Sequence, residues 1–215
     1  MIIYIPIKEN SQRVPKKNFR IFKDKPLWEH TVDKLKYFNV VIDTDSDEII
    51  KKCVHKNWVS TYIRPNHLRG DKVSVVDLIK NYTDVHELSD EEWICQIHVT
   101  SPFFKVEHLE ILNKEILNCK YDSKFSVDII KNRFWRNEKY GLVPINHNPI
   151  KLEQTQDLPI YYMENSYLYL FKVGVLKFGN RIGKNSDVFP IDFPYNLDID
   201  TEKDWKLVKL IENYE

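Results

Sequence analysis

The residues with the clearest chemical potential follow the first apolar segment of the chain. Residues 2–7, IIYIPI, are almost entirely apolar, and the segment after them is polar and basic. Its basic members are Lys8, Arg13, Lys16, Lys17 and Arg20, and its small polar members are Asn10, Ser11, Gln12 and Asn18. Cations interleaved with hydrogen-bonding side chains are suited to a polyphosphate. The alternative is a solvated basic loop, because runs of charge usually face water.

Glycine is scarce in this chain and absent from the basic loop. Only 5 of the 215 residues are glycine. The loop is therefore neither a Walker loop nor a dinucleotide-binding fingerprint, both of which need glycine for close backbone approach. We expect side chains to meet phosphate charge at least as much as backbone N–H groups do.

The spacing of the loop resembles the nucleotide-binding signature of the CMP-sugar synthetases. These cytidylyltransferases activate sialic acid, its bacterial relatives and KDO, and typically show P-A-R-x-x-S-x-R-x-P-x-K at the amino terminus. Lys8 stands at the first basic position, Ser11 at the serine, and Arg13 and Lys17 at the later basic positions. Gln12 replaces a lysine common in the sialic-acid branch, and the glycines often seen between Lys8 and Ser11 are missing.

Other segments extend the resemblance over nearly the whole chain. Residues 40–45, VVIDTD, match a strand that ends in a T-D pair, and residues 97–102, IHVTSP, match an L-Q-P-T-S-P strand end. The stretch from Arg64-Pro65 through Gly70-Asp71 to Ser74 matches R-P-x-x-L-x-x-D-x-x-S. The resemblance implies that Lys17 lies nearest the α-phosphate of a bound nucleotide. The nucleotide-binding residues it implies are Lys8, Asn10, Ser11, Arg13, Lys17, Asn18, Arg64 and Asp71.

A pair of carboxylates near the carboxyl terminus is the candidate metal site. Residues 196–201, NLDIDT, resemble the family element S-I-D-I-D-T, which holds magnesium. Alternate residues of an extended segment point the same way, so Asp198 and Asp200 can present two carboxylates to one side. Mg²⁺ prefers such hard oxygen ligands and keeps waters or phosphate oxygens in its remaining positions. The alternative is that Asp200 caps the last helix, for which Asp200 and Thr201 are both candidates, while Asp198 forms a salt bridge.

A second D-x-D element leaves a rival function open. Asp43 and Asp45 follow an apolar run, and glycosyltransferases use such a pair to bind a metal and the diphosphate of a nucleotide-sugar. Asp43 stands where serine is usual in the resembled family, and Asp45 is equally suited to capping a helix or holding the basic loop. A third alternative is a nucleotide-binding relative without turnover.

The acceptor side departs most from the family pattern. Residues 155–166, TQDLPIYYMENS, resemble R-Q-x-L-P-x-x-x-x-x-N-G, but threonine replaces the leading arginine and Ser166 replaces glycine. His98 stands where a glutamine usually reaches the sugar, although a lone histidine at a strand end is more often structural. The resemblance implies that His98, Gln156 and Asn165 bind the acceptor. Sialic, legionaminic, pseudaminic and KDO-like acids, or a phosphonate, all remain open as acceptors.

These motifs together predict a Mg²⁺-dependent cytidylyltransferase. A hydroxyl of a sugar acid would attack the α-phosphorus of CTP and displace pyrophosphate. Such a reaction needs alignment and charge neutralisation more than covalent chemistry. The expected catalytic residues are Lys17, Arg13 and Asp200, with Asp198 and Asp200 as the metal ligands.

The elements that must position these residues alternate between strands and helices. Strands are predicted at 2–7, 40–43, 59–63, 94–99, 125–129 and 167–171, and helices at 27–37, 47–56, 72–82, 106–117 and 202–212. Repeated βα units predict a Rossmann-like α/β fold, with a mostly parallel sheet and helices on both faces. Ligands of such sheets bind at the carboxyl ends of the strands, where the basic loop begins. We expect one domain over residues 1–215.

The alternation stops at residues 131–158, which are polar and non-periodic. A compact domain rarely holds so long an irregular stretch without using it. Phe134 and Trp135 could anchor it, and Arg133 and Arg136 could meet an acceptor carboxylate. In the resembled family this part of the chain packs on a second subunit. We therefore predict a protruding dimerisation and acceptor-side segment in a homodimer.

The composition of the chain argues against several classes of partner and location. The 32 basic residues equal the 32 acidic ones, so no global charge favours nucleic acid or a membrane as a partner. No apolar run approaches about 18 residues, and we expect the amino-terminal residues to form a strand and not a basic-then-apolar leader. The three cysteines are unevenly spaced and contain no C-x-x-C, so reduced thiols are expected. These features predict a cytoplasmic protein.

Overall fold

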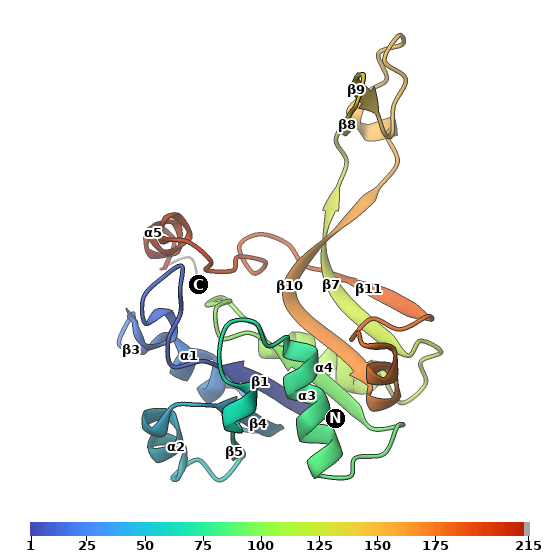
Figure 1. Cartoon of the computed structure of the whole chain (residues 1–215). Helices are drawn as coiled ribbons and strands as arrows, with labels where there is room; N and C mark the ends of the chain where they lie inside the picture. The colour runs from blue at the N-terminus through green and yellow to red at the C-terminus, as the bar shows by residue number, and fades with distance from the viewer. Residues whose placement is uncertain (213–215) are drawn as a thin grey trace.

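The computed structural model describes residues 1–212 and builds them around a seven-stranded sheet (Figure 1). The strand order is β11-β7-β10-β6-β1-β4-β5. The bounds are β1 Ile2–Ile7, β4 Asn39–Thr44, β5 Val59–Ile63, β6 Trp93–Ile97, β7 Ser123–Ile130, β10 Tyr161–Lys172 and β11 Ser186–Pro190. β1 is parallel to β4 and β6, β4 to β5, and β7 to β11, whereas β10 is antiparallel to both of its neighbours. The predicted α/β class with a mostly parallel sheet is confirmed.

Helices cover both faces of this sheet. They are α1 Leu27–Lys34, α2 Asp47–Cys53, α3 Val75–Val85, α4 Val106–Glu115 and α5 Glu202–Leu210. Short 3-10 helices are η1 Lys17–Phe19, η2 Asn66–Leu68, η3 Thr155–Asp157 and η4 Val173–Phe178. Two small antiparallel pairs complete the fold, β2 Ile21–Phe22 with β3 Lys25–Pro26, and β8 Trp135–Glu138 with β9 Gly141–Pro144.

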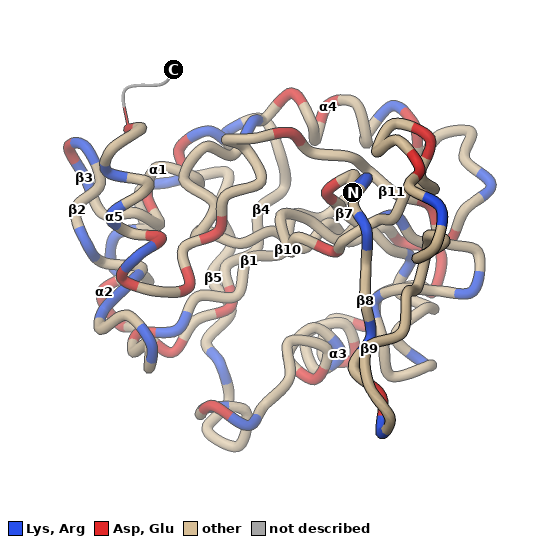
Figure 2. Tube along the Cα trace, turned by 90° about the horizontal axis from the view of Figure 1, so that it is seen from above, with Lys and Arg blue, Asp and Glu red and all other residues tan. Residues whose placement is uncertain are grey.

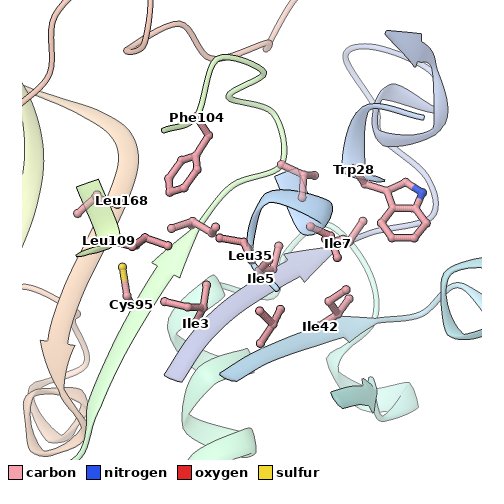
Figure 3. Packing of buried hydrophobic residues seen from close by; sticks show 14 of the residues in the cluster. Ile3, Ile5, Ile7, Trp28, Leu35, Ile42, Cys95, Phe104, Leu109 and Leu168 are labelled. Carbon is pink, nitrogen blue, oxygen red and sulfur yellow. The ribbon is translucent and has the colours of Figure 1, made fainter. Parts of the chain in front are cut away.

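The alternation of side chains along β1 divides the core into two layers. Ile3, Ile5 and Ile7 are fully buried on the face covered by α1, α2 and α4 (Figure 3). Tyr4 points to the opposite face, where it packs with Ile79 of α3 and Val175 of η4. Side chains on both faces of β1 pack into a hydrophobic layer. This packing fixes the position of the carboxyl end of β1, from which the basic loop starts.

A third, smaller core joins the last helix to the first loop. Phe22 and Leu27 pack against Ile199 and Val208. The N-cap of α5 is Thr201, which forms a capping box with Asp204. This packing places residues 196–201 next to the basic loop, although the two segments lie near opposite ends of the sequence.

Several predicted boundaries are wrong. The helix predicted from Lys72 begins at Val75, because Ser74 forms a capping box with Asp77 and the residues before it are not helical. The strand predicted at 167–171 is only the buried half of β10, whose outer half, starting at Tyr161, is exposed. The edge strand β11 was not predicted, since only two of its side chains are even partly buried.

Residues 131–158 project from the body as an extension, which is carried by the outer ends of β7 and β10 (Figure 1). The prediction of an irregular segment is wrong in one respect, because β8 and β9 form a hairpin within it. The hairpin escaped prediction because its strands have short apolar patterns and little burial. The extension and the outer end of β10 expose large apolar side chains, namely Trp135, Leu142, Ile150 and Leu152 in the extension and Tyr161, Tyr162 and Met163 in β10.

Candidate active site

An open cavity of about 500 Å³ lies at the carboxyl ends of β1, β5 and β6. After β1 the chain adds β4 and β5 on one side of this strand and then crosses to add β6 on the other side. Open α/β sheets usually bind their ligands at such a reversal of strand order. The predicted site residues that line it are Lys8, Asn10, Ser11, Arg13, Lys17, Asn18, Arg64, Asp71, His98, Asp198 and Asp200. Segments far apart in the sequence therefore converge as predicted.

The basic loop after β1 is shaped by its own polar contacts. Asn18 is buried, and its Nδ2 donates to the carbonyl of Lys8 at 3.0 Å. Lys16 takes a left-handed conformation with φ 52° immediately before η1, and the N–H of Lys17 donates to the carbonyl of Val14 at 3.1 Å. This turn directs Lys17 inward while Lys16 faces solvent.

Arg20, the last cation of the loop, is structural. Its guanidinium makes two hydrogen bonds to the Glu202 carboxylate, at 2.8 and 2.6 Å, and lies over the Trp205 ring. Glu202 begins α5, so this fork ties the basic loop to the last helix.

Asp200 is the point at which two loop cations meet. Nη2 of Arg13 lies 2.8 Å, and Nζ of Lys17 3.3 Å, from the same oxygen, Oδ1. Lys17 also donates to the carbonyl of Ile199, and only 14% of its side chain is exposed. The alternative that Asp200 caps the last helix is wrong, because the N-cap is Thr201. The Asp200 carboxylate faces the cavity instead.

Asp198 fits a metal-ligand role on separate grounds. Its Oδ1 is buried and has no hydrogen-bond partner among the described residues. Ile199 between the two aspartates is fully buried, and its N–H donates to the carbonyl of Thr100 at 3.0 Å. Both aspartates line the cavity. Residues 1–212 contain no group of three or more His, Cys, Asp and Glu that could hold a metal, so two carboxylates are what the protein offers, as Mg²⁺ commonly uses.

Asp71 anchors a second group of loop residues. Nζ of Lys8 lies 3.3 Å from Oδ1 of Asp71 and donates to the carbonyl of Gly70 at 2.9 Å. Gln12 donates to the other carboxylate oxygen of Asp71 at 2.5 Å. The segment after β5 thereby closes against the loop after β1, with Asn10 and Ser11 on the cavity wall.

Asp43 and Arg64 form a fully buried ion pair. Nε of Arg64 lies 2.6 Å from Oδ1 of Asp43, and both side chains are 0% exposed. The Tyr4 hydroxyl donates to Oδ2 of Asp43, and burial raises the pKa of both Tyr4 and Asp43. Asp43 cannot reach a ligand, so the interpretation of Asp43 and Asp45 as a metal pair is wrong. Nη1 of Arg64 is buried without a partner among residues 1–212, and Arg64 lines the cavity.

Asp45 holds the basic loop. Its Oδ1 accepts from the backbone N–H of Glu9 at 2.8 Å. The N-cap of α2 is Ser46 rather than Asp45, so of the two structural roles expected for Asp45 the structure has the loop contact.

His98, the first of the predicted acceptor residues, is neutral in this site. Its Nε2 lies 2.7 Å from Nε2 of the fully buried Gln96. Burial lowers the pKa of His98 to about 4, against the opposing attraction of Asp198. Since the Gln96 amide donates, His98 accepts at Nε2 and carries its proton on Nδ1.

The other two predicted acceptor residues lie outside the cavity lining. Asn165 donates to Asp128 of β7 at 2.8 Å, and Asn196 donates to the same oxygen at 2.9 Å, so Asp128 links β10 to the segment that precedes the metal pair. Gln156 is exposed on the extension and bonds to Gln154. Its acceptor role stays a prediction. Ser166, which lines the cavity, adopts φ 60°, which explains why glycine is usual there in the resembled family.

Arg181 is the site residue that the sequence motifs missed. It lies between η4 and β11, lines the cavity, donates to Oε1 of Gln96, and places its Cζ 3.3 Å from the Tyr169 ring centroid. Burial lowers its pKa. No motif includes this position, and a single arginine between two weakly patterned elements gives no sequence signal.

Positive charge is gathered at the site and not over the surface. Acidic and basic residues are interspersed around the whole trace (Figure 2). Among the described residues, no helix is long and apolar enough to cross a bilayer.

Comparison with known proteins agrees with this geometry. The sequence model of the cytidylyltransferase family matches residues 2–215. The chain is 29% identical over 208 residues to N-acylneuraminate cytidylyltransferase A of Danio rerio, covering 93% of this chain but only 47% of the fish protein. It is 25% identical over 228 residues to pseudaminic acid cytidylyltransferase of Campylobacter jejuni, covering 96% of this chain and 94% of that protein.

The fold has solved counterparts as well. The structure of CMP:2-keto-3-deoxy-manno-octonic acid synthetase complexed with CTP superimposes with a TM-score of 0.65 at 12% identity. The superposition covers 99% of this chain and 98% of the synthetase. At that identity the likeness concerns the fold.

Proposed function

Because this chain belongs to the cytidylyltransferase family, we propose that it transfers CMP from CTP to a hydroxyl of a sugar acid and releases pyrophosphate. The observation that carries this proposal is the meeting of Arg13 and Lys17 at Asp200 inside the cavity. Arg13 and Lys17, which are suited to binding phosphate, are thereby in direct contact with Asp200, whose carboxylate is suited to binding a metal.

Catalysis by these residues would be mainly positional and electrostatic. Lys8, Arg13 and Lys17 would hold the triphosphate, with Lys17 at the α-phosphate, because it is the most enclosed of the three. Charge on the α-phosphate oxygens grows during displacement, and a preorganised cation in an enclosed site stabilises that charge. Arg64, Asp71 and Asn18 would surround the cytidine.

Asp198 and Asp200 would hold Mg²⁺. Both aspartates line the same cavity as the cations, and Oδ1 of Asp198 has no hydrogen-bond partner among the described residues. A bound Mg²⁺ would polarise phosphoryl oxygens and lower the pKa of a coordinated hydroxyl.

The acceptor we propose is a nonulosonic acid or a KDO-like acid. The support is that relatives over most of this chain are named for N-acylneuraminate and pseudaminic acid. His98 would contact the sugar directly, Asn165 would position the strand beside it, and Gln156 would reach it from the extension. A UDP-sugar glycosyltransferase is not favoured, because Asp43 is buried in its pair with Arg64.

The extension completes the proposal. We propose a single cytidylyltransferase domain over residues 1–215, of which 213–215 lie outside the described residues, with 131–158 docking on a second copy. Exposed Trp135 of this segment, together with exposed Tyr162 and Met163 at the outer end of β10, supplies the apolar surface for this contact. Arg133 donates to the carbonyl of Glu153, and Arg136 pairs with Glu138. Both would have to exchange these partners to meet an acceptor. The cytoplasmic location stays a prediction.

Pyrophosphate release is the direct test. The purified chain is incubated with CTP, Mg²⁺ and a panel of sialic, legionaminic, pseudaminic and KDO-type acids, with UTP and ATP as nucleotide controls. We expect release with CTP and at least one acid, and none after chelation of the metal. CTP binding without release for every acid would favour a non-catalytic relative, and sugar transfer from a nucleotide-sugar would overturn the proposal.

A further inference from the structure

Arg181 is a cation of the active-site cavity that forms no ion pair with an acidic residue of the described chain. The other basic residues at the cavity pair with aspartates: Lys8 with Asp71, Arg13 and Lys17 with Asp200, and Arg64 with Asp43. Within residues 1–212, Arg181 forms no ion pair with an aspartate or glutamate. Glu164 attracts the guanidinium electrostatically without forming an ion pair with it, so no carboxylate of the described chain occupies the donors of Arg181.

The guanidinium of Arg181 is held in a fixed orientation. Gln96 and Tyr169 are directly opposite one another in the antiparallel register of β6 and β10. Arg181 donates from Nη1 to Oε1 of Gln96 and lies with Cζ 3.3 Å from the Tyr169 ring centroid. The Tyr169 hydroxyl is in turn bonded to Glu164. A guanidinium carries five donors in one plane, so this arrangement uses one of them, fixes one face of the plane, and leaves an edge for a planar anion.

The strand order places Arg181 away from the triphosphate-binding loop. Arg64 follows β5 on one side of β1, whereas Gln96 and Tyr169 belong to β6 and β10 on the other side. The basic loop lies at the end of β1 between them. A nucleotide that extends from Arg64 to the basic loop would occupy one half of the cavity. The other half, which is lined by His98, Ser166 and Arg181, would then be available to the acceptor.

We propose that Arg181 binds the carboxylate of the acceptor and thereby restricts the reaction to sugar acids. This inference rests on the proposed function and names the feature of the substrate that the site selects. In a 2-keto sugar acid the carboxylate is attached to the carbon that bears the reacting hydroxyl. An arginine that fixes the carboxylate thus also fixes the nucleophile, and a guanidinium matches a carboxylate through two parallel hydrogen bonds.

The neighbouring groups fit a carboxylate better than a phosphate. His98 is neutral and Ser166 presents a hydroxyl, so Arg181 is the only charged donor among these three. A phosphate with its larger charge would be expected to lie among several cations, as the loop after β1 provides. One arginine with hydroxyl and amide neighbours suits a single negative charge.

The test combines a protein change with a substrate change. The variants are Arg181→Gln and Arg181→Lys, and the matched control is Lys184→Gln, which alters an exposed cation of the same loop. The substrates are the sugar acid that gives the fastest pyrophosphate release and its C1 carboxamide. CTP binding is measured separately by calorimetry, and thermal unfolding checks that each variant is folded.

The expected result is a rise in KM for the acid of about tenfold to a hundredfold in Arg181→Gln, the scale of a lost charge-assisted pair. CTP affinity and the Lys184→Gln control should be unchanged. Wild-type protein should prefer the acid over the carboxamide, Arg181→Gln should lose most of that preference, and Arg181→Lys should retain part of it.

Distinct outcomes separate the two proposals. No pyrophosphate release by wild-type protein with any acid would overturn the function. Turnover with an unchanged acid preference in folded Arg181→Gln and Arg181→Lys, or a loss confined to CTP affinity, would overturn only the role of Arg181. If Arg181→Gln fails to fold, Arg181→Lys with the two substrates decides.

Discussion

Lys17 and Asp200 are 183 positions apart in the sequence, yet Nζ of Lys17 lies 3.3 Å from Oδ1 of Asp200. The contact joins the loop that opens the first βα unit to the segment that opens the last helix. In the proposed reaction, Lys17 would bind the phosphate and Asp200 would bind the metal. The proposed reaction therefore requires Lys17 and Asp200 to exchange this contact for contacts with the phosphate and the metal.

Replacing Lys17 tests the phosphate-binding role. Lys17→Ala should reduce pyrophosphate release by at least about a hundredfold, because a preorganised cation contributes roughly 3–4 kcal/mol to an oxyanion-like transition state. Lys16→Ala is the matched control, since Lys16 is adjacent and exposed. Near-normal turnover of a folded Lys17→Ala protein would contradict the assignment.

Asp200 and Thr201 separate metal binding from helix capping. Asp200→Asn should abolish Mg²⁺-dependent turnover while the melting temperature barely changes, because the cap is the neighbouring residue. Thr201→Ala should do the reverse and lower the free energy of unfolding by about 1 kcal/mol with turnover largely kept. Unfolding and activity are measured on both variants. Loss of stability without loss of activity in Asp200→Asn would restore the capping interpretation.

The buried pair of Arg64 and Asp43 should dominate local stability. Arg64→Gln leaves a carboxylate buried without its cation, which should lower the free energy of unfolding by about 3–5 kcal/mol. The double variant Asp43→Asn with Arg64→Gln removes both charges and should recover much of that loss. Urea unfolding of both single variants and the double variant gives the coupling energy. Additive losses would show that the two side chains act independently.

The ion pair between Asp43 and Arg64 could not be predicted from the sequence, whereas several strands and the first loop could. Strands β1 and β4 were predictable because valine and isoleucine dominate them and most of their side chains are buried on both faces. Burial of Asp43 was not predictable, because aspartate is rarely buried unless paired and its partner lies 21 residues away. The cavity-lining residues of the first loop were predictable because their spacing is a motif. Arg181 was not, because only the pairing of β10 with β6 places Tyr169 and Gln96 beneath it.

His98 should make stability depend on pH. Its pKa is about 4 in the folded protein and 6.5 in the reference state, mainly through burial. A lowered folded pKa means that the unfolded chain binds the proton first, so stability is full above about pH 6.5 and falls as the pH drops toward 4. At pH 5 the loss should be about 2 kcal/mol.

The measurement for His98 is urea unfolding at pH 7.5 and pH 5. His98→Gln is the comparison, because glutamine keeps a polar side chain without titrating in this range, and the other titrating groups are common to both proteins. Wild-type protein should lose about 2 kcal/mol more than His98→Gln between these two pH values. Equal losses would mean that His98 titrates normally.

The extension should hold two copies together. Tyr161, Tyr162 and Met163 at the outer end of β10 are exposed, and they line an apolar hollow together with Phe134 and Ile145 of the extension. Exposed apolar patches of this kind mark interaction sites, and a two-fold dimer is the commonest assembly. Sedimentation at micromolar concentration should give twice the 25.8 kDa mass of one chain.

Tyr162→Glu should shift that equilibrium toward the monomer, because a charge would be buried in the apolar contact. Tyr37→Glu is the matched control, since Tyr37 is an exposed tyrosine on the body, 89% accessible, after α1. If the extension also carries Gln156 to the partner's acceptor site, the monomeric variant should lose affinity for the sugar acid while its CTP affinity is kept. A wild-type protein that sediments as a monomer at every concentration tested would rule out the dimer. A dimer insensitive to Tyr162→Glu would move the interface off the extension.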